Sequence, residues 1–190
     1  MEKRLEELNV EVIGGQIISR VLSDENDSIE IKTVVAKTIN DGYIDEDNLV
    51  INSYKKDVEE KRITKLNDII IKLTAPFSAV KVDEDNVGLL VSSFCSIIRF
   101  NDEVINRDYF VAYLNSELCK KQVEDLMVGT GIQTLSIKSF KNILIPVPTI
   151  EKQEEIGKTY MNYLENKKLI KKLEILQKEK IQTMIALLGE

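Results

Sequence analysis

The stretch Ile145-Pro-Val-Pro-Thr-Ile-Glu-Lys-Gln153 marks a change of architecture along this chain of 190 residues. After it, residues 151–188 contain no proline and one internal glycine, Gly157, and their apolar side chains recur at three- and four-residue spacing. This pattern predicts a single helix about 57 Å long. Because a domain of about 150 residues is narrower than that, part of the apolar stripe needs a partner helix.

The chain before this point carries short segments of alternating or β-branched residues, which are typical of strands. Residues 88–100 form the longest such run and predict one central strand, and Asn-Asp-Gly42 predicts a hairpin-like turn. Apolar spacing over residues 107–127 predicts one amphipathic helix. Shorter strands are expected within residues 9–21, 29–35, 49–51, 66–74 and 143–145. We therefore predict an α+β head with a mixed, twisted sheet over residues 1–149, followed by a helix over 150–190.

Composition excludes several classes of protein. The chain is 43% hydrophobic and 31% charged, which is an ordinary globular balance. It contains no histidine, which excludes Ser-His-Asp and Cys-His catalysis and histidine zinc sites. Cys95 and Cys119 lack the CxxC spacing, so they are expected to be buried residues of a reducing compartment. The net charge of -6 disfavours nucleic acid, although an acidic protein can carry a local basic patch.

The expected location is the cytoplasm, with no membrane contact. The first eight residues are charged and lack the apolar region of a signal peptide. The longest uncharged run, residues 87–98, is too short to cross a bilayer.

Two local motifs admit more than one interpretation. Gly129-Thr-Gly-Ile-Gln-Thr-Leu-Ser136 could hold a phosphate with its backbone N–H groups, or it could end one helix and cap another at Ser136. Capping is favoured on local grounds. The acidic tips Asp45-Glu-Asp47 and Asp83-Glu-Asp85 lack EF-hand spacing and are read as solvated loop tips, not as metal or acid–base sites.

Six segments occur in the order found in the specificity (S) subunits of type I restriction-modification systems, which the chain resembles from about residue 10 to residue 188. The last two are the most specific, because they lie at the family's separation and precede a long helix. The segments are Asp41-Gly-Tyr-Ile-Asp45, Leu66-Asn-Asp-Ile-Ile-Ile71, Val91-Ser-Ser93 with Ile97-Ile-Arg99, Tyr109-Phe-Val-Ala-Tyr-Leu-Asn-Ser116, residues 129–136 and residues 145–153.

The resemblance implies that the head is a target recognition domain and that the helix is a spacer. Members of this family have two heads and two helices, whereas this chain has one of each and looks like a half-subunit. The resemblance also implies no catalysis and no cofactor: S-adenosylmethionine would belong to a methyltransferase (M) subunit and cleavage to a restriction (R) subunit. The expected partners are double-stranded DNA, these two subunits and a second copy of the chain.

Candidate DNA contacts are polar and basic loop residues, which could read base edges and fix the register on phosphates. Residues 52–72 hold six basic side chains against four acidic ones. The candidates are Lys55, Lys56, Lys61, Arg62, Lys72, Thr74, Ser78, Ser92, Ser93, Thr130, Gln133, Thr134, Ser136 and Lys138. The candidate dimer contacts are Ile156, Tyr160, Tyr163, Leu164, Ile170, Leu173, Leu176, Ile181, Met184 and Leu188.

Two other classes of function stay open from the sequence. One is an orphan half-subunit that occupies the methyltransferase and blocks assembly without reading DNA. The other is an enzyme that uses the carboxylates of the acidic tips. The only support for it in the sequence is that these tips are rich in Asp and Glu.

Overall fold

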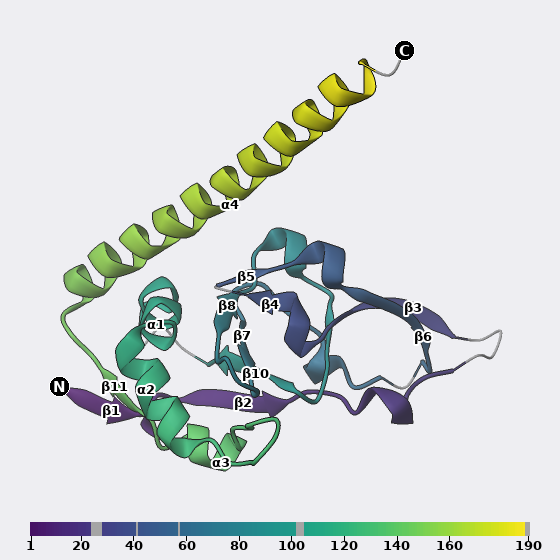
Figure 1. Cartoon of the computed structure of the whole chain (residues 1–190). Coiled ribbons are helices and arrows are strands. Elements are labelled where there is room, and N and C mark those ends of the chain that lie inside the picture. The colour runs from purple at the N-terminus through teal and green to yellow at the C-terminus, as the bar shows by residue number, and fades with distance from the viewer. Residues whose placement is uncertain (24–27, 41, 57, 102–104, 189–190) are drawn as a thin grey trace.

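The structure, a computed structural model, describes residues 1–23, 28–40, 42–56, 58–101 and 105–188. It is an α+β head of short strands and short helices, from which one long helix, α4 (Ile150–Ala186), extends (Figure 1). The predicted fold class and the predicted long helix are both confirmed. No described helix is long and apolar enough to cross a membrane.

An antiparallel sheet of four strands forms the centre of the head. Its order is β2 (Val10–Gly14), β10 (Cys95–Phe100), β7 (Ile69–Lys72) and β8 (Ala79–Lys81). Every residue of β7 is buried, because each face of the sheet meets a separate core. Ile69 and Ile71 point into one apolar cluster, which α1 and α2 cover, and Ile70 points into the other.

A second sheet is mixed, as predicted. β3 (Ile29–Val34) pairs antiparallel with β6 (Val50–Tyr54) and parallel with β9 (Leu90–Val91). The remaining strands form two pairs: β1 (Glu2–Arg4) with β11 (Leu144–Pro146), and β4 (Ile39–Asn40) with β5 (Tyr43–Ile44). β4 and β5 confirm the predicted hairpin, whose Gly42 has φ of +88°. Asp41 of that turn lies outside the described residues.

Single-turn 3-10 helices connect many of these strands. Among the described residues they are η1 (Leu5–Glu7), η2 (Ile18–Arg20), η3 (Ala36–Thr38), η4 (Glu46–Asn48), η5 (Glu60–Arg62) and η6 (Glu84–Asn86). Within residues 9–21, where the Gly14-Gly15 pair predicts two short strands or one bulged strand, a single strand, β2, ends at Gly14, and η2 follows it.

The run 88–100 is not one strand, which corrects the prediction. It contains β9 and β10, which belong to different sheets and are separated by a turn in which the Cys95 N–H donates to the Ser92 carbonyl at 2.9 Å. Both strands are buried on both faces, so their composition carries no alternation that could reveal the break.

The helix predicted over 107–127 is two helices, α1 (Arg107–Leu114) and α2 (Glu117–Leu126). Asn115 ends α1 and its amide donates to the Ala79 carbonyl at 2.8 Å, while Ser116 Oγ accepts from the Cys119 N–H and begins α2. Leu118, which the periodic pattern placed in the core, is 73% exposed. The apolar residues keep their three- and four-residue spacing across Asn115 and Ser116, so the sequence pattern did not show where α1 ends and α2 begins.

The first half of α4 packs against the head, mainly on α1. Gln153 is buried, and its side chain accepts from the Asn106 N–H at 2.9 Å and donates to the Pro148 carbonyl at 2.9 Å. A Cβ on Gly157 would lie 2.7 Å from the Tyr109 nitrogen, so only glycine permits this close crossing of α4 and α1. After Lys167, every described residue of the helix is exposed.

A largely buried ion pair joins β10 to Asp68, the residue directly before β7. Arg99 donates to both carboxylate oxygens of Asp68 at 2.9 and 2.6 Å, and to the Ile63 carbonyl at 3.1 Å. The hydrogen bonds that it donates to the Asp68 carboxylate raise the pKa of the Arg99 guanidinium. Asp68 is only 3% exposed and also accepts from the Lys65 N–H, so its charge is fully compensated inside the fold.

Both cysteines are buried, as predicted. Burial raises the pKa of each thiol to about 12, so both stay protonated near neutral pH. In the described part of the chain, no group of three or more His, Cys, Asp or Glu side chains could hold a metal ion.

Candidate nucleic-acid interface

Three loops that are distant in sequence meet at one end of the central sheet. The Leu73 N–H donates to the Phe94 carbonyl at 2.9 Å, and the Leu73 carbonyl accepts from the Leu135 N–H at 2.8 Å. The Ala75 N–H donates to the Gln133 carbonyl at 3.2 Å. These bonds join residues 73–76, 92–94 and 128–136 into one continuous face, which we call the loop surface.

The loop surface exposes uncharged side chains on a fixed backbone. Ser93, Phe94, Thr130, Ile132 and Gln133 are all exposed, although the backbone hydrogen bonds above hold their loops together. Hydroxyl and amide groups held in this way can donate to and accept from base edges. A rigid scaffold also gives such contacts a defined register.

The predicted candidates in residues 128–138 divide into two groups. Thr130, Gln133 and Lys138 are exposed and suited to contact DNA. Thr134 is half-buried and bridges Thr74 and Val128. Ser136 caps α3 (Ile137–Phe140), because its Oγ accepts from the Ser139 N–H at 3.0 Å. The capping interpretation of this motif is therefore confirmed.

Four predicted contacts are buried, which corrects their placement on an open loop. They are Lys72, Thr74, Ser78 and Ser92, at 8%, 7%, 6% and 4% exposure. Lys72 ends a buried strand, and the Ser78 hydroxyl accepts from the Gly42 N–H at 3.3 Å. Side chains with so little exposed surface offer almost nothing to a DNA molecule that docks on the outside.

Two members of the predicted basic group, Lys61 and Arg62, make contacts within the chain. Lys61 and Arg62 both pair with Glu59, at 2.8 and 2.9 Å, and Arg62 also donates to the carbonyls of Gly14 and Gly15 at 3.0 and 2.5 Å. The hydrogen bond from Lys61 lowers the pKa of Glu59, which therefore stays ionised.

Lys55 and Lys56, directly after β6, are both exposed. Asp57, counted with this group in the sequence, lies outside the described residues.

Sequence reasoning missed the apolar members of the site. Phe94 is 56% exposed and Ile132 is 74% exposed. Phe94 was placed inside a predicted strand, and the Ser-Ser pair before it was the available signal for a turn.

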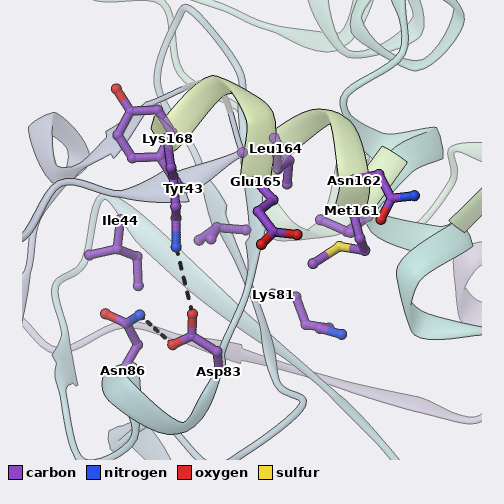
Figure 2. Close-up of a pocket in the computed structure, with 13 residues that line it drawn as sticks. Tyr43, Ile44, Lys81, Asp83, Asn86, Met161, Asn162, Leu164, Glu165 and Lys168 are labelled. Carbon is purple, nitrogen blue, oxygen red and sulfur yellow. Dashed lines mark hydrogen bonds and ion pairs between the residues drawn. The ribbon is translucent and has the colours of Figure 1, made fainter. Parts of the chain in front are cut away.

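A cleft of about 240 Å³ lies between α4, the β4–β5 hairpin and β8 (Figure 2). Lys168 reaches across it toward Asp83, with 4.0 Å between the charged atoms, and Asp83 also accepts from Asn86. Lys171 pairs with Asp45 at 3.8 Å. The Lys171 ammonium also donates a hydrogen bond to the Tyr43 hydroxyl, which raises the pKa of this ammonium. The acidic tips are largely exposed to solvent, as predicted, and one carboxylate of each tip also pairs with a lysine of α4.

The predicted dimer contacts also divide into two groups. Leu164 is buried on the head, Ile156 packs against its core, and the Tyr160 hydroxyl accepts from the Asn115 amide at 2.8 Å. These three are used within the chain, which corrects their assignment. The others are at least half exposed: Tyr163, Ile170, Leu173, Leu176, Ile181, Met184 and Leu188.

The head carries the loop surface, and α4 docks on the head and projects beyond it. The family model of the type I restriction modification DNA specificity domain matches residues 1–178, and the chain belongs to this family. It is thus a specificity domain, not a catalytic one.

Two curated relatives are named as specificity subunits of type I restriction enzymes. The specificity subunit of the type I restriction enzyme EcoBI of Escherichia coli is 25% identical over 134 residues, which cover 70% of this chain and 28% of the relative. The specificity subunit of the type I restriction enzyme MjaVIII of Methanocaldococcus jannaschii is 29% identical over 135 residues, which cover 66% and 31%. The chain thus spans less than a third of either relative.

Solved structures share the fold. The HsdS subunit of Thermoanaerobacter tengcongensis matches with a TM-score of 0.64 and 20% identity, over 91% of this chain and 44% of that one. The S subunit of a type I restriction-modification system from M. genitalium matches with a TM-score of 0.61 and 17% identity, over 94% and 42%. These likenesses concern the architecture alone.

Proposed function

We propose that the chain recognises a specific sequence in double-stranded DNA and directs a partner methyltransferase and a restriction subunit to it. The loop surface carries the proposal, because it presents hydrogen-bonding side chains on a fixed backbone in a member of a DNA specificity family. The chain uses no cofactor of its own, and S-adenosylmethionine belongs to the methyltransferase. It acts in the cytoplasm.

The recognition step combines base readout with phosphate contacts. Gln133 is exposed, and a glutamine amide can donate to and accept from one adenine in the major groove. Lys55 and Lys56 neutralise phosphates and hold the register.

The exposed half of α4 forms a homodimer. An unpartnered apolar stripe on a projecting helix is buried most simply by a second copy around a twofold axis, and antiparallel packing places a head at each end. Two identical heads then read two identical half-sites, so the target is an interrupted palindrome.

Selection from a randomised duplex pool by mobility shift tests this function. Enrichment of one motif supports the proposal that the chain recognises a specific DNA sequence. The net charge of -6 favours one alternative, a half-subunit that blocks assembly. That alternative requires tight binding to the methyltransferase and no DNA binding even in its presence.

Replacing Lys55 and Lys56 with Glu is expected to weaken binding to every sequence, because both lysines contact phosphates. Plotting the logarithm of affinity against that of salt concentration should give a slope smaller by about 2. The control carries the same charge change at Lys158 and Lys178, which are exposed on α4. An unchanged slope would place the phosphate contacts elsewhere.

Gln133→Ala is expected to relax base preference at one position of the motif and to spare non-specific affinity. The loss of one bidentate contact corresponds to about 1–3 kcal/mol of discrimination. Repeated selection with the variant measures it, and Gln182→Ala on the exposed part of α4 is the control. If the enriched motif stays the same, Gln133 does not read bases.

A further inference from the structure

A second cavity, of about 510 Å³, adjoins the loop surface. One wall is a face of the antiparallel pair β3 and β6, where Val50, Asn52 and Tyr54 alternate along β6 and therefore point to the same side. The opposite walls come from Ile17 and Ser19 at η2 and from the Ser92–Phe94 turn. A volume of this size is typical of sites for small organic ligands.

The chemistry of the cavity suits a neutral ligand that forms hydrogen bonds. Every described side chain that lines it is uncharged. Thr33 and Tyr54 share a hydrogen bond of 2.5 Å between their hydroxyls, and the Asn52 amide donates to the Tyr54 hydroxyl at 3.3 Å. Asn52 is partly exposed and Ser93 is exposed, so both can offer hydrogen-bonding groups to a ligand in the cavity.

The mouth of the cavity presents an aromatic ring on a rigid turn. The Ser92 N–H donates to the Val34 carbonyl at 2.9 Å and the Ser93 N–H to the Gln16 carbonyl at 2.8 Å, while the Phe94 carbonyl accepts from Leu73. The backbone is thus fixed on both sides, yet the Phe94 ring is 56% exposed. An exposed, fixed aromatic ring beside a cavity with uncharged, mostly apolar walls is suited to stack on a flat, uncharged group.

We propose that this cavity receives one nucleobase turned out of the bound double helix. The inference rests on the proposed function, because the base comes from the DNA that the loop surface reads. A nucleobase is planar, uncharged and rich in donors and acceptors, which matches the ring, the neutral walls and the polar groups of Asn52 and Ser93. Phe94 and Ser93 belong to both the cavity and the loop surface, so a base leaving the duplex there has a short path into the site.

A mismatch scan of the selected duplex tests the proposal, with the full chain alone and no methyltransferase present. Each position carries a mismatch in turn, and fluorescence anisotropy measures affinity. A mismatched base costs less to extrude, so one position, or two adjacent ones, should bind about tenfold more tightly than the paired duplex. 2-Aminopurine at the same position should brighten on binding, because it leaves the base stack.

Phe94→Ala should abolish both the tighter binding and the brightening, whereas Phe94→Tyr should retain them. The matched control is Ile51→Ala, since Ile51 is 59% exposed and points to the opposite side of β6 from Asn52. Folding of each variant is checked by circular dichroism.

Three outcomes overturn the proposal. Binding with no favoured mismatch position rules out extrusion, and a gain that survives in Phe94→Ala places the extruded base elsewhere. Loss of methyltransferase binding by Phe94→Ala with DNA binding intact assigns the cavity to a protein side chain. If anisotropy shows no binding to any duplex, the proposed function fails together with this inference.

Discussion

Replacing Ile170 and Leu173 together with Asp is expected to leave the chain monomeric. Both side chains are more than half exposed on the part of α4 that projects beyond the head, and they lie on one face of the helix. In a dimer, two Asp residues per chain would place four buried carboxylates in an apolar interface, which is strongly unfavourable. The head should stay folded, because neither residue contacts its core.

Light scattering at tens of micromolar measures this directly. The control introduces the same two charges at Gln182 and Ala186, which are exposed and lie on the opposite side of α4 from Ile170 and Leu173, and this variant should remain dimeric. A wild-type chain that is monomeric at this concentration would contradict the homodimer. The stripe would then be assigned to a methyltransferase or to a different half-subunit.

Arg99→Met is expected to lower the free energy of unfolding by about 3–5 kcal/mol, because it leaves the buried Asp68 carboxylate without its cation. Urea denaturation followed by circular dichroism measures the change. Arg4→Ala serves as the control, since its ion pair with Glu6 is exposed and such pairs contribute about 0–1 kcal/mol. The double variant Asp68→Asn with Arg99→Met should recover part of the loss. A loss below about 1 kcal/mol for Arg99→Met would show that the pair is screened by water.

The elements that could be predicted are those whose pattern is local. α4 begins at its predicted start and ends at Ala186, four residues before the predicted end, because no breaker interrupts its periodic stripe. The division of α1 from α2 escaped prediction, because Asn115 and Ser116 cap the two helices without disturbing the spacing. The division of β9 from β10 escaped it because burial on both faces removes alternation.

The candidate site was predictable only where exposure follows from local composition. Thr130 and Gln133 lie in a glycine-rich loop and are exposed, as expected. Thr74 was read as a loop residue beside Pro76, yet it is buried because the chain pairs it with Thr134, sixty positions later. Arg62 bonds to Gly14 and Gly15 in the same long-range manner. Such contacts depend on tertiary packing, which no short motif records.

The close crossing at Gly157 determines which piece of the chain can be moved between proteins as a unit. The prolines at 146 and 148 look like a natural point for splicing, but they mark a change of secondary structure and not an end of packing. A graft cut there would leave α1 without Gln153, Gly157 and Leu164, which complete its covering layer. A transplantable recognition unit therefore includes about five turns of α4, to Lys168. The junction with another protein should lie in the exposed part of α4 after that residue.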